Sequence, residues 1–379
     1  MASAVHLPPD EPPFSVKLPN TIWVFGQPIR GELTIDYRRA LEENLERVVL
    51  ELRGTIYTES STTPDGDGAY ETSSTDVLHK SATLWRRTDA AAVRLPFEFA
   101  LPADLPPAFA FACAHLHAAR VRYALVATGF RAGLFARDRT VTLPLAAIPA
   151  DALGAGLRAR LKAGWPDAAW GRLKAEREVR RHPWSAPGTL RVELLVPHID
   201  TFPLFTPVPY TVVVRTLSAR VRLKGDDCEG AEPFPPPIRD AAPLAFALRR
   251  AVDMRTPLGP SAPEEHVADV LPVPGAGAGV EVEVGERVWV PEPGGRREGR
   301  GRWAQAATFR SRMFLRCSPS FVTEEVKVKY VLCLKCEFPG AGNCVRIELP
   351  INVGSGAVRP ISLAGDVGPG SMYMLDLPP

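Results

Sequence analysis

A short strand-like pattern occurs twice in this chain of 379 residues, and it restricts the fold more than any other feature. Residues 121–125 read VRYAL and residues 328–332 read VKYVL. In each copy Val, Tyr and Leu stand two positions apart, so on a β-strand they share one face while Arg or Lys points to the other. Self-similarity of this kind predicts two copies of one structural unit.

The segments around the two copies match in the same order. Downstream, LPL at 143–145 corresponds to LPI at 349–351, and upstream, PAF at 107–109 corresponds to PSF at 319–321. Between these patterns the chain consists of short apolar runs that are interrupted by Pro or Gly, which is typical of a β-sandwich. The fold class that we expect is all-β, with two tandem immunoglobulin-like β-sandwiches.

The composition agrees with this expectation. The chain holds 39 prolines and 30 glycines, and proline is excluded from helix interiors and central strands, so a helical bundle is not expected. A hydrophobic share of 45% is enough for sizeable cores. The length favours two domains over one.

The expected boundaries follow from the positions of the runs. Residues 14–37 predict two strands, residues 40–46 a helical turn, and residues 151–181 the one extended helix. The domain map that we expect is a first sandwich at 14–150, a partly helical connector at 151–186, a second sandwich at 187–356 with a loop-rich insertion at 225–305, and a flexible tail at 357–379.

Charge and sequence signals place the chain among cytoplasmic proteins. A net charge of +2 argues against a dedicated nucleic-acid binder. The start of the sequence predicts no signal peptide, and no apolar run approaches the length of a transmembrane helix. Six cysteines in a chain of this size indicate reduced thiols rather than a disulfide framework.

Several runs occur in an order that resembles the arrestin family. The first half contains FGQPIRG, LRG, LPFEF, LPADLPPAF, VRYALVA and TLPL between residues 25 and 145. The second half contains VPYTVVV at 208–214 and, over 318–351, a segment that runs from SPSF to IELPI. These residues are similar to an arrestin N-domain followed by an arrestin C-domain, in the α-arrestin or arrestin-related trafficking adaptor branch found in fungi. The resemblance covers roughly 14–146 and 187–354.

The resemblance implies two seven-stranded sandwiches and a non-catalytic adaptor in endocytosis or sorting. The implied partners are cytoplasmic segments of membrane transporters or receptors, with the protein in the cytoplasm or peripheral at the plasma membrane or endosomes. Many α-arrestins also recruit a HECT ubiquitin ligase through PPxY motifs. This sequence holds no Pro-Pro-x-Tyr, so ligase recruitment stays open. The alternative is a structural, complex-forming protein like the retromer-type relatives of arrestins.

The expected partner surface is basic. Lys17, Arg30 and Arg122 are the candidates in the first half, where the run FSVKL predicts an edge strand with free backbone groups. Lys17 is followed by Leu18, so a clamp of two adjacent lysines, which the family uses to sense phosphate, is not predicted. Arg296 and Arg297 lie in the densest basic cluster, RREGRGR, which either contacts anionic lipid or a phosphorylated tail or is a solvated loop.

No catalytic, cofactor or metal site is predicted. The chain contains no GxSxG, Walker lysine or HExxH motif. The CLKC run at 333–336 lies in a strand-like segment, which favours buried thiols over a redox or zinc pair; a zinc site with Cys317 and Cys344 is the alternative. His115 and His117 alternate on one strand, and a metal there needs further ligands.

Overall fold

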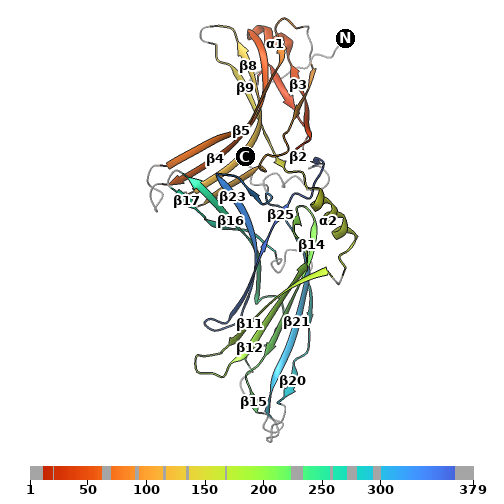
Figure 1. The fold of residues 1–379 in the computed structure, drawn as a ribbon, viewed down its shortest axis with the longest axis vertical. Coiled ribbons are helices and arrows are strands. Elements are labelled where there is room, and N and C mark those ends of the chain that lie inside the picture. Colours follow the sequence, from red (N-terminus) through yellow and green to blue (C-terminus); the bar gives the residue numbers. More distant parts are fainter. Residues whose placement is uncertain are drawn as a thin grey trace.

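The computed structural model describes residues 12–19, 21–61, 70–89, 94–113, 117–133, 136–166, 169–222, 234–256, 259–270, 280–292 and 300–362. Almost all of its regular structure is β-strand, in several sheets, so the all-β class is confirmed. Figure 1 shows an elongated molecule in which the strands of the first half occupy one end and most strands of the second half the other.

The first half runs from β1 to β10. Its elements are β1 (Phe14–Lys17), β2 (Thr21–Val24), β3 (Pro28–Ile35), α1 (Tyr37–Glu42), β4 (Leu45–Ser61), β5 (Tyr70–Arg86), β6 (Arg94–Ala100), β7 (Phe109–Cys113), β8 (His117–Arg131), β9 (Arg139–Leu145) and β10 (Ala147–Ile148).

Two sheets of the first half pack against each other. One has the order β1-β3-β6, and the other has the order β5-β4-β8-β7 with β9 also paired to β8. Phe14 of β1 lies directly over Gly129 of β8, where a Cβ atom would overlap its ring. Phe14, Leu33 and Leu50 are completely or almost completely buried in the common core. Burial of these faces is the main force that holds the layers together.

The second half follows helix α2 (Ala152–Ala163). Its strands are β11 (Trp170–Val179), β12 (Gly188–Pro197), β13 (Phe202–Pro203), β14 (Pro207–Leu217), β15 (Val221–Arg222), β16 (Leu244–Thr256), β17 (Gly259–Ser261), β18 (Glu264–Asp269), β19 (Glu281–Val284), β20 (Val288–Pro291), β21 (Arg300–Phe314), β22 (Phe321–Val322), β23 (Val326–Glu337), β24 (Cys344–Ile351), β25 (Val353–Gly354) and β26 (Ile361–Ser362).

Two larger sheets form the second half as well. One has the order β11-β12-β14-β21-β15, with β19 and β20 also paired to β21, and the other has the order β17-β16-β23-β22, with β18 and β24 at its sides. Tyr210 of β14 meets Phe246 of β16 edge to face, with 5.1 Å between the ring centroids. The Tyr210 hydroxyl donates a 3.3 Å hydrogen bond to the main-chain oxygen of Val270. The two sheets therefore face each other across a shared core.

The repeated pattern occupies equivalent places in β8 and β23. Tyr123 stands opposite Leu145 of β9, and Tyr330 stands opposite Ile351 of β24. The predicted face is confirmed in both copies, because the Val, Tyr and Leu of each are buried. Arg122 and Lys329, between them, are exposed.

The two halves touch through side chains from several strands. Phe109 of β7 meets Phe321 of β22 edge to face at 5.4 Å. Thr58 of β4 donates to the main-chain oxygen of Arg255 at 3.5 Å. Arg250 of β16 is only 3% exposed and donates a 3.3 Å hydrogen bond to the main-chain oxygen of Ala110 in the first half. The halves are thus joined by a contact that contains a buried charge.

The helix expected at 151–181 is wrong beyond its first part. Helix α2 begins after Asp151, whose side chain accepts a hydrogen bond from the Gly154 amide at 2.7 Å, and ends before Gly164. Residues 170–179 are instead strand β11, paired with β12 along its full length. Ala, Lys, Glu and Arg favour helices, but ladder pairing outweighs this weak preference.

Three further expectations need correction. Residues 14–37 hold three strands rather than two, because the chain turns at Gly26, which has φ of +81°. The expected helical turn at 40–46 lies earlier, at Tyr37–Glu42. The insertion at 225–305, expected to be loop-rich, contains β16, a central strand of its sheet, at the run 244–254 that the sequence also allows as a strand.

The expected tail also contains ordered structure. Strand β26, within 357–379, pairs with β2 of the first half through Ile22 and Ile361. Both side chains are buried. No helix in the described ranges is both long enough and apolar enough to cross a membrane.

Candidate functional site

Two arginines stand side by side on the outer face of the β4–β8 pair. Arg120 and Arg122 lie two positions apart on β8, opposite Tyr57 and Thr55 of β4. The residue between them, Val121, is completely buried in the core. The alternation of a strand therefore presents both guanidinium groups on the face that points away from the core.

An aromatic ring supports the first of these arginines. The Arg120 guanidinium carbon lies 5.6 Å from the centroid of the Tyr57 ring, within the range of a cation–π contact. The Tyr57 hydroxyl donates a 2.5 Å hydrogen bond to the carboxylate of Glu59. This hydrogen bond, together with partial burial, raises the pKa of Tyr57, so the phenol stays neutral. The ring is a fixed platform beneath Arg120.

The second arginine has an unfavourable electrostatic environment. Partial burial lowers the pKa of Arg122, and the neighbouring positive charge of Arg120 lowers it further. Within the described part of the chain, neither side chain forms an ion pair with a carboxylate. Two adjacent cations without a counter-charge attract an anion, and guanidinium groups bind phosphate or carboxylate with paired hydrogen bonds.

Farther along the same face, a third arginine, Arg53, is paired with a carboxylate. Glu51 accepts a 2.5 Å hydrogen bond from Arg53, and His79 Nε2 lies 3.2 Å from its other oxygen. Burial alone raises the pKa of Glu51, but the bonds from His79 and Arg53 outweigh it, and the pKa lies below its usual value of 4.5. Arg53 therefore has an internal partner, unlike Arg120 and Arg122.

The three basic residues predicted in the first half do not form one surface. Lys17 stands opposite Glu32, and Arg30 forms a 2.8 Å ion pair with Glu98, all on the outer face of the β1-β3-β6 sheet. Arg122 lies on the outer face of the opposing sheet. The core between the two sheets separates Lys17 and Arg30 from Arg122.

The predicted edge strand is confirmed. In the ranges that the structure describes, β1 pairs with β3 alone, so its other side has unpaired backbone groups. An edge of this kind can accept an added strand from a partner. Arg296 and Arg297 lie outside the described residues.

The second half contains a hollow of about 640 Å³ on the sheet that includes β11, β12, β14 and β21. Arg191 and Arg215 line it, but each already has a carboxylate partner. Arg191 Nε donates to Glu176 at 2.7 Å, and Arg215 Nη1 donates to Glu193 at 3.1 Å. This hollow therefore has less unbalanced positive charge than the β4–β8 face.

The CLKC residues lie inside strand β23, as predicted, and both thiols are buried. Burial raises the pKa of Cys336 to about 12. His117 lies between Ser60 and Ser261, 3.1 Å and 3.2 Å from their hydroxyl oxygens. No group of three or more His, Cys, Asp or Glu side chains able to hold a metal occurs among the described residues.

Sequence reasoning missed Arg120 and Tyr57 as members of the site. The alternation that places Arg122 on the outer face places Arg120, which is half-buried, on the same face, so the same pattern contained the signal. Tyr57 could be paired with Arg120 only once the register of β4 against β8 was known. Models of known protein families give no match to this chain, and a search of curated proteins finds no significant relative.

Proposed function

We propose that this protein is a non-catalytic cytoplasmic adaptor that binds acidic or phosphorylated cytoplasmic segments of membrane transporters or receptors. The observation that carries the proposal is the pair Arg120 and Arg122 on the outer face of β8. Arg122 is exposed and Arg120 is half-buried, and neither has a carboxylate partner in the described residues. Anionic side chains of an extended segment supply the missing counter-charges, and Tyr57 offers an aromatic surface beside them.

The finer fold is part of the same proposal. We take the two halves as tandem immunoglobulin-like sandwiches of the arrestin type. The equivalent registers of β8 against β9 and of β23 against β24 support this interpretation. The ordered series of arrestin-like runs in the sequence supports it independently. A binding protein needs no cofactor, and we propose none.

Proximity labelling in cells tests the proposal. The wild-type protein is compared with an Arg120→Gln/Arg122→Gln variant, and an Arg249→Gln/Arg312→Gln variant serves as the matched control. Both control residues are exposed in the second half and have no ion-pair partner among the residues described. We expect transporters or receptors to be labelled by the wild type and the control but depleted with the first variant.

Two other results carry different conclusions. Labelling of coat subunits alone, unchanged in the Arg120→Gln/Arg122→Gln variant, supports the retromer-like structural alternative and contradicts the proposed site. Labelling of a HECT ligase together with cargo answers whether a ligase is recruited without a PPxY motif.

A further inference from the structure

A second group of arginines lies at the end of the first half, where α1 and the turn from β8 to β9 meet (Figure 1). We define the arginine tip as Arg47, Arg86, Arg87 and Arg137. These residues come from the start of β4, the end of β5 with the turn after it, and the connection between β8 and β9. Separate segments of the chain thus contribute positive charge to one end of an elongated molecule.

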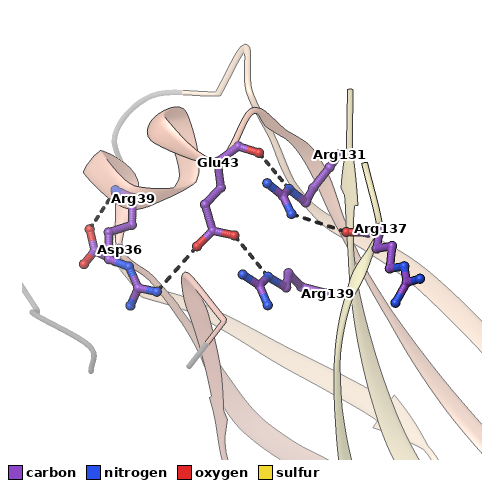
Figure 2. A network of polar contacts seen from close by, with 6 residues as sticks. All are labelled: Asp36, Arg39, Glu43, Arg131, Arg137 and Arg139. Carbon is purple, nitrogen blue, oxygen red and sulfur yellow. Dashed lines mark hydrogen bonds and ion pairs between the residues drawn. The ribbon is translucent and has the colours of Figure 1, made fainter. Parts of the chain in front are cut away.

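The scaffold of the tip is fixed by one carboxylate and its neighbours (Figure 2). Glu43 lies between Arg39 and Arg139, with oxygen–nitrogen distances of 3.4 Å and 3.1 Å. Its main-chain oxygen accepts a 2.8 Å hydrogen bond from Arg131 Nε. Arg131 Nη1 also donates to the main-chain oxygen of Arg137 at 3.5 Å. These bonds hold the end of α1 against the β8–β9 turn.

Three other carboxylates nearby bind main-chain amides, whereas Glu46, the residue before Arg47, has an exposed side chain. Asp36 accepts from the amide of Arg39 at 3.1 Å and so caps α1. Asp89 accepts from the amide of Arg86 at 2.7 Å, and Asp138 from that of Arg131 at 3.2 Å. These carboxylates stabilise the local turns.

The guanidinium groups of the tip are left exposed. All of them are exposed residues, and no ion pair to any of them occurs within the described ranges. Arg47 stands directly opposite Arg86 in the β4–β5 ladder, an arrangement of like charges that destabilises a sheet. The Arg47 guanidinium carbon lies over the ring of Phe130, 4.4 Å from its centroid. An external anion would relieve this repulsion.

The positions of these arginines favour an extended anionic surface as the ligand over a single peptide strand. The arginines occur at the end of the long axis of the molecule and come from several turns, rather than along one strand that could guide a peptide. The whole chain is nearly neutral, at +2, so attraction to an anionic surface depends on local charge. Cytoplasmic leaflets are negatively charged, and guanidinium binds their phosphate and carboxylate groups.

We propose that the arginine tip docks this protein on membranes that contain anionic phospholipids. This inference is separate from the binding of protein segments at Arg120 and Arg122, which lie farther along β8. With the tip on the bilayer, the β4–β8 face remains uncovered for cytoplasmic segments of membrane proteins.

Vesicle co-sedimentation with the purified full chain tests the proposal. The vesicles are phosphatidylcholine alone or phosphatidylcholine mixed with phosphatidylserine, at low and at physiological ionic strength. The tip variant carries Arg→Gln at positions 47, 86, 87 and 137. The matched control carries Arg→Gln at positions 172, 239, 249 and 312, which are exposed second-half arginines without an ion pair in the described residues, and its net charge changes equally.

We expect the wild type and the control to bind the mixed vesicles and not phosphatidylcholine alone. Each basic side chain near an anionic leaflet contributes about fivefold to partitioning, so the tip variant should bind more than about 100-fold more weakly at low salt. Binding by the wild type should fall as ionic strength rises. A triple variant that retains Arg47, and therefore its contact with Phe130, should show most of this loss if the quadruple variant is unstable.

The inference would be overturned by no binding of the wild type to the mixed vesicles, by an equal loss in the control, or by unchanged binding of a folded tip variant. Selective binding of single-stranded RNA at the tip in preference to vesicles also counts against it. Binding of an acidic peptide at Arg120 and Arg122, measured on the tip variant, distinguishes failure of this inference from failure of the adaptor proposal.

Discussion

Tyr330 donates a hydrogen bond from its buried hydroxyl to the main-chain oxygen of Ser318 at 2.8 Å. Tyr123 makes the matching bond to Pro106 in the first half at 2.7 Å. Burial raises the pKa of both phenols well above the ordinary value, so both stay protonated and remain donors. Each tyrosine therefore fastens the central strand of its sheet to the loop that precedes the neighbouring strand.

The first prediction concerns these tyrosines. Tyr330→Ala should lower the free energy of unfolding by about 2–5 kcal/mol, because it leaves a cavity in a closed core. Tyr330→Phe should cost about 1–2 kcal/mol, because it keeps the ring but leaves a buried acceptor without its donor. Urea denaturation measures both. Lys329→Ala, which removes an exposed pair with Asp253 on the opposite face, should cost less than about 1 kcal/mol.

Tyr123→Ala and Tyr123→Phe should repeat this order in the first half. A neutral effect of either alanine variant would contradict the register of the repeated pattern.

The second prediction concerns the contact between the halves. Arg250 forms an ion pair with Glu265, and its guanidinium carbon lies 4.9 Å from the centroid of the Phe109 ring. Arg250→Ala should lower the free energy of unfolding by about 3 kcal/mol, the lower end for a broken buried pair, because Glu265 keeps partial contact with water. Small-angle scattering should show a larger radius of gyration, because the hydrogen bond to Ala110 is also lost.

Arg249 provides the control for this measurement. It is the adjacent residue on β16, exposed, and without an ion pair in the described residues. Arg249→Ala should change stability by less than about 0.5 kcal/mol. Equal effects of the two alanine variants would contradict the role assigned to Arg250.

The third prediction concerns thiol reactivity. Cys336 is completely buried and its pKa is raised to about 12, so little thiolate forms at pH 8. Cys344 is only partly buried. Brief treatment of the folded protein with iodoacetamide, followed by site-resolved mass spectrometry, should show modification of Cys344 and protection of Cys336. Equal and rapid modification of both would mean that β23 is not packed as described, and unfolding in urea is the positive control.

The fourth prediction is a pH dependence. The pKa of Glu51 is depressed in the folded protein by His79 and Arg53, so Glu51 contributes stability above its unfolded pKa, and this contribution is lost as pH falls through the folded value. Glu51→Gln should cost about 0.5–1 kcal/mol at pH 7, and the difference from wild type should shrink as pH falls below the usual Glu value of 4.5 and through the lower folded pKa. Glu46→Gln, on the same strand and exposed, should change the free energy of unfolding at pH 7 by less than about 0.5 kcal/mol. A difference for Glu51→Gln that does not change with pH would contradict the assignment.

The sequence was a good guide wherever local alternation decided the outcome. Val121, Tyr123 and Leu125 are buried in phase because a strand repeats every two residues. Residues 170–179 were predicted wrongly because they are rich in residue types that favour a helix. They form a strand because they pair with β12. Strand β26 could not be predicted from local alternation because its partner, β2, lies more than three hundred residues earlier in the chain.

The candidate site shows the same limit. The exposure of Arg122 follows from its place in the repeated pattern, and this prediction is confirmed. Its separation from Lys17 and Arg30 depends on which sheet each strand joins, and the residues of a strand do not determine the sheet to which it belongs. Whether a basic side chain forms an ion pair depends on which residue stands opposite it on the neighbouring strand. Arg30, for example, stands opposite Glu98 and pairs with it.

The most direct measurement is an anisotropy titration of the purified protein with acidic peptides from transporter tails, in phosphorylated and unphosphorylated forms. We predict tighter binding of the phosphorylated form and a loss of at least about tenfold in Arg120→Gln/Arg122→Gln, since a charge-assisted hydrogen bond contributes about 1.5–3 kcal/mol. Arg249→Gln/Arg312→Gln should bind as wild type. In the same experiment, the Lys17→Gln/Arg30→Gln variant tests whether the outer face of the β1-β3-β6 sheet contributes to peptide binding. Wild-type affinity in a folded Arg120→Gln/Arg122→Gln variant would contradict a binding site at these two arginines.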